Sequence, residues 1–397
     1  MASEWRKHRI KDVVSFVVDN RGKTPPTQDE GHILLEVNAV SATEKFPLYQ
    51  EVRKHVSQEV YGTRFRKGHP KKGDILVPTV GTLGAVSLMD RDDCCIAQNL
   101  IAIRCDETTC HSHFLYYVLC NPMTRKRLLN LNIGGVQPSI KVPHLMELEI
   151  ELPSIGEQKK IAELLSLLDD KIWCNKRIND NLQQQVATIF HQWFVANPES
   201  EKWPLVTLDS LTSLVSRGIA PKYTDDSVQI VLNQKCIRDH YIDVSLARRH
   251  NPKVINEKWL QYGDLLINST GEGTLGRAAQ VWFVPDNMTV DSHVTIVRPK
   301  GPHLLFYIGL WGISHEREIE ALHTGSTGQT ELPRERVKAM ELRLPDNDTL
   351  VRFNAVIAPI VSLIITNQQE NVRLASIRDA LLPKLMSGEI DVTDIQL

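Results

Sequence analysis

The sequence repeats one pattern twice, and this repeat limits the possible architecture more than any other feature. Gly81-Thr82-Leu83-Gly84 recurs residue for residue as Gly273-Thr274-Leu275-Gly276. Gly73-Asp74, followed by an apolar run, likewise recurs as Gly263-Asp264. Because motifs that recur in the same order indicate repeated structural units, we expect two similar halves related by an internal pseudo-two-fold.

The spacing between repeated positions divides each half into two parts. It shortens early in each half and then stays constant from Gln137 onward, so the insertions and deletions fall in the first part. We predict globular parts of variable length at 1–152 and 198–344, followed by tails of constant length at 153–197 and 345–397. Variable segments suit recognition, whereas constant segments suit a fixed geometry.

The globular parts are expected to mix helices and strands. Short apolar runs rich in β-branched residues, such as Ile75 to Val80 and Val294 to Val297, are punctuated by Gly, Asp and Pro, as strands are. The Gly-Thr-Leu-Gly segments are followed by Ala85 and Arg277, so they lack the Lys-Ser/Thr of a phosphate-binding loop. We interpret them as tight turns that close hairpins.

Each tail predicts a long helix with the seam of a coiled coil. Seam residues follow alternating steps of four and three, and the second tail repeats the first after 192 residues. The first seam comprises Ile161, Leu165, Leu168, Ile172, Asn175, Asn179, Leu182, Val186, Ile189 and Trp193. The second comprises Phe353, Ile357, Ile360, Ile364, Asn367, Asn371, Leu374, Arg378, Leu381 and Leu385. Ile377 is expected to replace Arg378 by a small rotation of the helix.

Two asparagines interrupt each seam near its middle. Seam asparagines cost stability and fix register. If the helices pack antiparallel about a local two-fold, Asn175 and Asn179 face Asn371 and Asn367. The alternative is that these side chains point to solvent where packing is loose. Pro359 predicts a kink or a late start of the second helix, because proline lacks a backbone donor.

Composition indicates a soluble, cytoplasmic chain. No stretch of the 397 residues approaches about 18 consecutive apolar residues, and the N-terminus lacks the apolar core of a signal peptide. The seven cysteines form no CxxC pair, which favours reduced thiols. A crowded group of thiols and imidazoles fits no standard zinc spacing, so we predict no metal. That group comprises Cys105, Cys110, His111, His113 and Cys120.

The net charge of −2 opposes nucleic-acid binding unless positive charge is concentrated locally. The segment 61–72 carries five Lys and Arg residues with no acidic residue. Arg248 and Arg249 occupy what we interpret as the corresponding part of the second half. Either segment alone also fits a solvated loop, but a matched pair favours two nucleic-acid surfaces.

The tails carry motifs that resemble a known family. The sequence Leu152-Pro153-Ser154-Ile155-Gly156-Glu157-Gln158-Lys159-Lys160-Ile161 resembles the central conserved region of type I restriction-modification specificity subunits. The segment from Leu381 to Ile390 resembles their C-terminal conserved region. Trp5, the Gly-Asp pairs and the Gly-Thr-Leu-Gly turns fit their target-recognition domains. Leu350, which stands where the first repeat has Gln158, departs from the pattern.

The resemblance implies an α+β fold with two mixed α/β target-recognition domains, 1–152 and 198–344, separated by two long helices in an antiparallel coiled coil. Each domain would read one half of an asymmetric, bipartite DNA site. A helix of roughly 35 residues is about 50 Å long, so the helices would set the spacing between half-sites. The resemblance also implies two adenine-methylating modification subunits and the restriction subunits as partners. S-adenosylmethionine, ATP and Mg would then enter through the partners, with none bound by this chain.

Two other classes of function compete with this interpretation of the sequence. A self-contained methyltransferase or nuclease requires an Asn/Asp-Pro-Pro-aromatic motif with a Gly-rich cofactor loop, or clustered carboxylates followed by lysine. Neither pattern occurs in the sequence, so we predict a non-catalytic chain. A repeated coiled-coil adaptor without DNA binding explains the tails but leaves the basic segments unexplained, and it stays the alternative.

Candidate DNA contacts are side chains that can reach base edges or phosphates from the variable parts. In the first half they are Arg21, Lys23, Asn38, Lys45, Arg64, Arg66 and Gln137. In the second half they are Arg217, Lys222, Tyr223, Asn233, Lys235, Arg238, Arg277 and Gln329. Some have structural alternatives: the two turn arginines, Arg21 and Arg217, would brace their turns, and the two glutamines would bind backbone within their loops.

Overall fold

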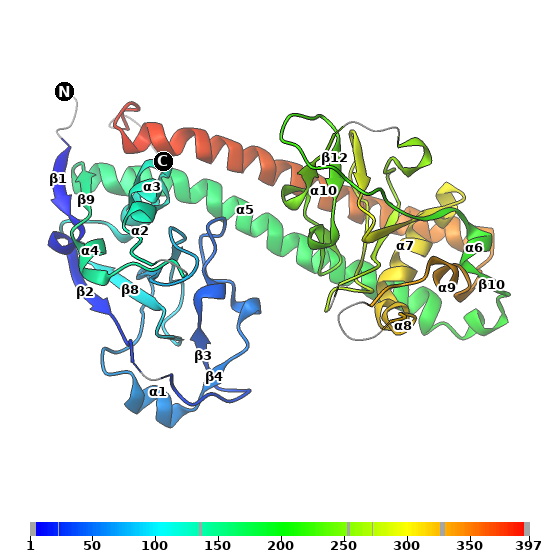
Figure 1. The fold of residues 1–397 in the computed structure, drawn as a ribbon, viewed down its shortest axis with the longest axis horizontal. Helices are drawn as coiled ribbons and strands as arrows, with labels where there is room; N and C mark the ends of the chain where they lie inside the picture. Colours follow the sequence, from blue (N-terminus) through cyan, green and yellow to red (C-terminus); the bar gives the residue numbers. More distant parts are fainter. Residues whose placement is uncertain are drawn as a thin grey trace. The chain divides into compact units, whose positions relative to one another are not determined.

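The computed structural model describes residues 5–22, 24–134, 137–251, 255–271, 273–325 and 330–392. The chain forms two compact units, shown in Figure 1. Unit 1 comprises Met1–Cys174 with Glu370–Leu397, and unit 2 comprises Asn175–Gln369. The sequence predicted the globular parts and the helical tails as separate segments. The compact units instead combine one globular part with portions of both long helices, because the helices bury apolar side chains against it.

Unit 1 contains a four-stranded antiparallel sheet in the order β2-β8-β5-β6. Its strands are β2 (Val14–Val18), β8 (Leu100–Cys105), β5 (Ile75–Pro78) and β6 (Ser87–Leu88). In a second sheet, β3 (His32–Leu35) lies between antiparallel β4 (His55–Val56) and parallel β7 (Cys95–Ile96). A two-stranded ladder joins β1 (Arg6–Arg9) to β9 (Glu149–Leu152). The short helices are α1 (Gln58–Arg64), α2 (Ser112–Cys120), α3 (Pro122–Asn130) and α4 (Val142–Met146).

Unit 2 repeats this topology. Its antiparallel sheet has the order β11 (Thr212–Arg217), β19 (Val294–Pro299), β16 (Leu265–Asn268) and β17 (Ala278–Gln280). The strand β12 (Ile230–Leu232) lies between antiparallel β15 (Arg248–Arg249) and parallel β18 (Met288–Val290). A ladder joins β10 (Leu205–Thr207) to β20 (Glu341–Arg343). The short helices are α6 (Leu208–Leu211), α7 (Leu305–Ser314), α8 (Glu316–Ala321) and α9 (Arg334–Lys338).

The repeated Gly-Thr-Leu-Gly segments connect β5 to β6 and β16 to β17, which are antiparallel pairs. Gly81 and Gly84 have φ angles of 89° and 77°, and Gly273 and Gly276 have 70° and 86°. These left-handed conformations favour glycine. The prediction that these segments are hairpin turns is confirmed.

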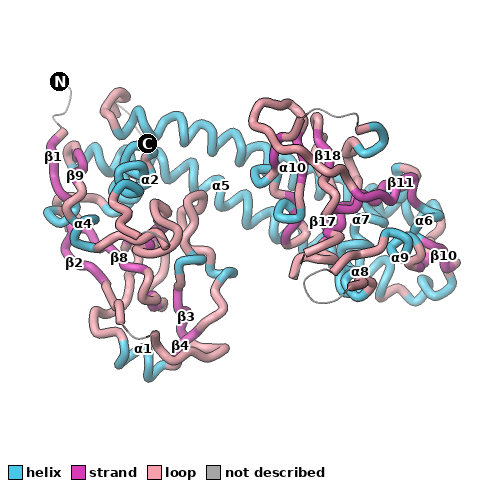
Figure 2. The backbone as a smooth tube through the Cα atoms, in the orientation of Figure 1, coloured by secondary structure: helices cyan, strands magenta, loops and turns pink. Residues whose placement is uncertain are grey.

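The two long helices are α5 (Ile155–Phe190) and α10 (Asn347–Met386), drawn as the longest helical segments in Figure 2. The start of α5 has a capping box, because Ser154 Oγ accepts from the Glu157 backbone N–H at 3.4 Å and Glu157 Oε2 accepts from the Ser154 backbone N–H at 3.2 Å. Where unit 2 has buried Leu350, unit 1 has Gln158, which is also buried and donates to the Thr109 and Pro153 carbonyls. The departure at Leu350 therefore exchanges a hydrogen-bonded amide for an apolar contact.

The two helices run antiparallel within each unit. In unit 1, Arg378 Nη1 of α10 lies 2.7 Å from Asp169 Oδ1 of α5. In unit 2, the rings of Phe190 and Phe353 lie 6.2 Å apart. The seam residues of both helices are buried or half-buried, as the heptads predict.

Two sequence predictions about α10 are wrong. Ile377 does not replace Arg378: Ile377 is 42% exposed, and Arg378 lies in the seam because Asp169 pairs with it. The predicted late start at Pro359 is also wrong. The helix α10 begins at Asn347 and continues through the proline to Met386. Gly388, with φ of 72°, follows the end of the helix as expected.

By length and composition alone, α10 is apolar enough to cross a membrane, since an 18-residue window has a mean hydropathy of 1.8. A single such helix is weak evidence, because core helices pass the same test. Phe353, Ile357, Val361 and Ile364 of α10 lie in the hydrophobic core of unit 2. Packing in that core accounts for these four apolar side chains of α10.

Candidate nucleic-acid interface

A buried ion pair occupies the same place in both units and explains the repeated Gly-Asp motif. In unit 1, Arg104 Nε and Nη2 donate to the two carboxylate oxygens of Asp74 at 2.9 and 2.7 Å. In unit 2, Arg298 makes the same two contacts with Asp264, both at 2.8 Å. Burial raises the pKa of Asp264, although the hydrogen bonds from Arg298 oppose the shift.

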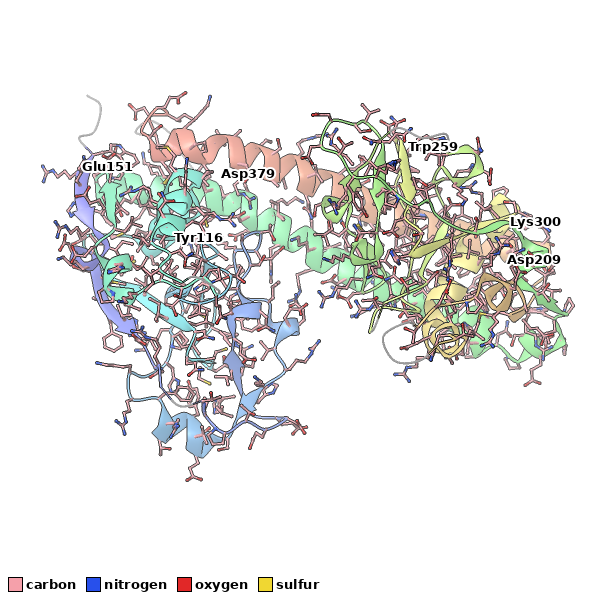
Figure 3. The ribbon with its side chains drawn as sticks, viewed as in Figure 1. Tyr116, Glu151, Asp209, Trp259, Lys300 and Asp379 are labelled. Carbon is pink, nitrogen blue, oxygen red and sulfur yellow. The ribbon has the colours of Figure 1, made fainter. Side chains whose placement is uncertain are left out.

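The ion pair joins a central strand of each sheet to the turn before its neighbour. The backbone N–H groups of Lys71 and Gln261 donate to the same aspartates at 2.8 Å. Arg298 Nη2 also donates to the carbonyl of Trp259, labelled in Figure 3, at 2.6 Å. The sequence reading assigned no partner to the aspartates. The signal was present in the arginine that ends both apolar runs, Leu100–Ile103 and Val294–Val297.

Asn38 and Asn233 brace equivalent loops. The side-chain N–H of Asn38 donates to the Glu51 carbonyl at 2.9 Å, and that of Asn233 donates to the Leu246 carbonyl at 3.2 Å. Each bond closes a loop of the same length. The repeat pairing of these asparagines is thus reproduced in three dimensions. One N–H of each amide is engaged with backbone, so the predicted DNA contacts of these residues would use the other N–H or the amide oxygen.

The two braced loops have different contents. In unit 1, Lys45 is buried and its ammonium lies 2.7 Å from Asp170 Oδ1 on α5. In unit 2, the loop forms a hairpin of β13 (Ile237–Arg238) and β14 (Tyr241–Ile242). Because Lys45 is held inside unit 1, we remove it from the residues proposed to contact DNA.

The two predicted turn arginines have internal partners. Arg21 forms an ion pair with Asp19, whose hydrogen bond raises the pKa of the arginine. Arg217 forms an ion pair with Glu331, and its Nη2 donates to the Leu332 carbonyl at 2.8 Å. These contacts match the alternative in which both side chains brace their turns.

The basic segment 61–72 of unit 1 presents Arg64 and Arg66 at the surface. It is anchored by a stack in which the Tyr61 ring lies 3.8 Å from His32 and 3.7 Å from His69. Its interpretation as the counterpart of Arg248 and Arg249 is wrong. Those arginines lie on β15, whose topological equivalent is β4, whereas segment 61–72 follows β4.

The remaining candidates lie at various depths. Gln137, Lys222, Lys235 and Arg238 are exposed, Arg277 is half-buried, and Tyr223 is 40% exposed. Lys23 and Gln329 lie outside the described residues. The roles of all these side chains in DNA contact stay predictions.

The seam asparagines are polar residues inside the helix packing. In unit 2, Asn367 Nδ2 donates to Asn179 Oδ1 at 2.8 Å, and Asn179 Nδ2 donates to the Ile364 carbonyl at 3.2 Å. The expected facing of Asn179 and Asn367 is present. Asn175 is buried and Asn371 is half-buried. The role of the four residues in fixing register stays a prediction.

The chain is similar in sequence to a known protein family and to known proteins. Residues 2–184 match the family described as type I restriction modification DNA specificity domain. The chain is 28% identical over 316 residues to the Type I restriction enzyme MjaIX specificity subunit of Methanocaldococcus jannaschii, covering 72% of this chain and 70% of that relative. Residues 2–184 belong to this family, and the chain as a whole is similar to type I restriction-modification specificity subunits.

Two further relatives of this specificity subunit agree. It is 22% identical over 402 residues to the Type I restriction enzyme HindI specificity subunit of Haemophilus influenzae, covering 81% of this chain and 87% of the relative. A crystal structure of the type I restriction-modification S subunit from M. genitalium is 17% identical, with a TM-score of 0.57 and 96% coverage of both chains. That likeness concerns the fold alone, and it agrees with the predicted fold class.

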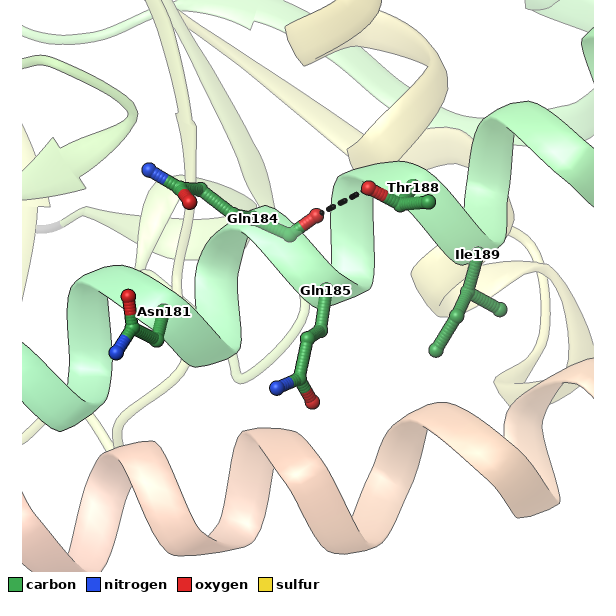
Figure 4. A pocket seen from close by; sticks show the side chains of 5 residues that line it. All are labelled: Asn181, Gln184, Gln185, Thr188 and Ile189. Atoms are coloured by element: carbon green, nitrogen blue, oxygen red, sulfur yellow. Dashed lines mark hydrogen bonds between the residues drawn. The ribbon is translucent and has the colours of Figure 1, made fainter.

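Membership of the family identifies the chain as the DNA-specificity component, not the catalytic one. A pocket of about 450 Å³ lies along α5 in unit 2, lined by Asn181, Gln184, Gln185, Thr188 and Ile189 (Figure 4). Its lining consists of amides, a hydroxyl and one aliphatic side chain, so it offers no acid, base or metal ligand of high affinity. In the part of the chain that the structure describes, no three His, Cys, Asp or Glu side chains are arranged to hold a metal.

Proposed function

We propose that this specificity subunit reads an asymmetric DNA site in two parts, one through the target-recognition domain of each unit. The supporting observation is the exact repetition of sheet order around different loops. Equivalent loops, braced by Asn38 and Asn233, contain a buried lysine in unit 1 and an exposed hairpin in unit 2. Two similar frames with different surfaces suit two different half-sites.

The proposal extends to the partner subunits. Two modification subunits would bind the conserved helical regions and methylate adenine with S-adenosylmethionine, and restriction subunits would add ATP- and Mg-dependent cleavage. The repeated helix seam supports two equivalent positions, because each unit presents one portion of α5 packed against one portion of α10. The assembly would act in the cytoplasm, where its DNA substrate is accessible.

The helices are proposed to set the distance between the half-sites. A helix of 36 residues, the length of α5, is about 54 Å long. Deleting one heptad from α5 together with the equivalent heptad from α10 preserves the seam pattern in both helices. The methylated site should then have a shorter spacer and unchanged half-site sequences. An unchanged spacer would contradict this role of the helices.

The principal test is a map of methylated adenines in DNA treated with the complex of this subunit and its modification partner. We expect a single two-part consensus of unlike half-sites, which disappears when this subunit is omitted. Binding should weaken steeply as salt increases, because phosphate contacts release counterions. Methylation that is independent of this subunit, with no salt-dependent DNA binding, would favour the adaptor alternative.

A further inference from the structure

An arginine and a tyrosine stack at the surface of unit 2. The guanidinium carbon of Arg248, on β15, lies 3.6 Å from the centroid of the Tyr223 ring. Arg248 is exposed, and 40% of Tyr223 is accessible to solvent. A guanidinium on an aromatic face is attracted by the ring electrons and loses rotational freedom, while its edge stays open to solvent.

Backbone hydrogen bonds hold the two residues in place. Tyr223 and His250 form an antiparallel bridge, in which the Asn251 N–H donates to the Lys222 carbonyl at 2.8 Å. Arg248 itself is paired with Val231 of β12, which is buried. The stack therefore sits on the edge of a sheet and does not depend on a long, unsupported loop.

The guanidinium of Arg248 has hydrogen-bonding capacity to spare. Among the described residues, the Arg248 side chain makes a ring contact with Tyr223 and no hydrogen bond or ion pair. The neighbouring Arg249 differs, because its Nη1 donates to the Ser227 carbonyl at 2.5 Å. Arg248 thus combines a restrained position with guanidinium N–H groups that have no hydrogen-bond acceptor among the described residues.

Unit 1 has different chemistry at the equivalent place. Gln28 and His55 form an antiparallel bridge one residue along from that of Tyr223 and His250, so by register Thr27 stands where unit 2 has Tyr223. By strand pairing, Lys54 stands where unit 2 has Arg248, and its ammonium forms an ion pair with Glu36 at 2.8 Å. The Gln28 side-chain N–H donates to the Glu30 carbonyl at 2.5 Å. The stacked pair is thus a feature of unit 2, which would make its effect specific to one half-site.

We propose that Arg248, oriented by Tyr223, reads a guanine in the half-site bound by the target-recognition domain of unit 2. An arginine fork can donate two hydrogen bonds to guanine O6 and N7 in the major groove, and guanine is the base whose edge presents two acceptors there. Stacking aligns the plane of the fork before DNA arrives, which lowers the entropy lost on binding. The inference rests on the proposed function and adds a specific base reader to it.

The test compares methylation maps of the complex containing the wild-type subunit and Arg248→Lys. Lysine keeps the positive charge but loses the planar fork. We expect the variant to lose roughly ten- to hundredfold discrimination at one guanine of one half-site. The other half-site and the spacer should be unchanged. Tyr223→Phe should retain the preference, because the ring is kept, whereas Tyr223→Leu should relax it at the same position.

Arg249→Lys is the matched control, since it changes the adjacent arginine on the same strand. It should leave the base preference intact. The inference would be overturned if the Arg248→Lys map were identical to that of wild type, or if preference were relaxed only at a base pair without guanine. In either case the two-part consensus of the wild type would still support the proposed function. A wild-type map without a two-part site would instead overturn the proposed function.

Discussion

In unit 1, the seam between the long helices contains an ion pair of Asp169 and Arg378, whereas unit 2 has Val361 and Val186 at the equivalent positions. All four side chains lie at the helix packing, and both valines are fully buried. Tyr117 of α2 also donates to Asp169 Oδ2 at 2.6 Å. One backbone arrangement therefore accommodates a hydrogen-bonded charge pair in one unit and an aliphatic pair in the other.

The same contrast applies to the surfaces. The sheets, the Gly-Asp turns and the Asn-braced loops are shared, but Lys45, the β13–β14 hairpin and the Arg248–Tyr223 stack are each found in one unit. Features that hold the backbone are repeated, whereas those that fill the helix seam or face solvent have diverged. Divergence at the surface is what two unlike half-sites would require.

The largest predicted effect concerns the shared Asp–Arg pair. Arg298→Met should lower the free energy of unfolding of unit 2 by about 3–5 kcal/mol, because it leaves the Asp264 carboxylate buried without its cation. Arg104→Met should cost unit 1 less, about 2 kcal/mol, because the Arg104 side chain is 28% exposed and water can reach the site. Denaturant unfolding, with hydrogen exchange to assign the unit that opens, measures both.

Arg66→Met serves as the control for that comparison, because it removes an exposed arginine from unit 1. It should change stability by less than about 0.5 kcal/mol. Equal losses for Arg298→Met and Arg104→Met would show that the difference in burial between the two ion pairs has no energetic consequence.

The second prediction converts the seam of unit 1 into that of unit 2. Arg378→Val alone should destabilise unit 1 by about 3 kcal/mol, because Asp169 is buried and loses its ion-pair partner. Adding Asp169→Val and Tyr117→Phe should restore wild-type stability or exceed it, since a well-packed apolar set often replaces a buried pair without loss. Thermal unfolding of the single and triple variants checks this. A triple variant less stable than Arg378→Val would mean that the two seams are not interchangeable.

The sequence predicted the features that repeat and missed those that do not. The heptads placed both helices, and the shift of 192 residues paired Asn179 with Asn367. Where loop lengths vary, spacing along the chain no longer locates structural equivalents. Segment 61–72 was matched to Arg248 and Arg249 for this reason, although strand pairing aligns those arginines with β4.

The sequence also did not predict polar partners that lie far apart along the chain. Arg378 seemed an interruption of the seam because Asp169 lies 209 positions away and on another helix. Lys45 looked like a DNA contact because its partner Asp170 lies on α5. Periodicity identifies which residues face inward, but it does not reveal which charges meet there. The site is therefore less predictable from the sequence than the fold.

The third prediction concerns acid sensitivity of unit 1. Burial lowers the pKa of His113 to about 4, from an ordinary value of 6.5. As pH falls from 6.5 towards 4, the unfolded chain binds a proton that the folded unit does not, so stability is lost in that window. After allowance for solvent screening, the loss should be about 1–2 kcal/mol. His113→Gln should flatten this part of the profile of unfolding free energy against pH, and an unchanged profile would contradict the prediction.

The smallest predicted effect concerns the hairpin that distinguishes unit 2. Its two-residue turn places Asp239 and His240 at φ of 50° and 61°, angles that favour Asn and Gly. Asp239→Asn with His240→Gly should therefore stabilise the hairpin by about 0.5–1 kcal/mol at pH 8. Thermal unfolding, with hydrogen exchange of residues 237–242, provides the measurement.

The gain from this double variant should shrink at pH 5.5. Glu316 lies 3.4 Å from His240 Nε2, and its hydrogen bond raises the pKa of the histidine. The stabilising contribution of His240 is therefore complete below the unfolded pKa and is lost as pH rises through the folded pKa. Replacing His240 removes that contribution only at low pH. Asp239→Asn alone keeps the His240–Glu316 pair but removes the Asp239 charge, which also raises the pKa of His240, so its gain should shrink at pH 5.5 by less than that of the double variant. A larger gain for the double variant at pH 5.5 than at pH 8 would refute a stabilising role for His240 and Glu316.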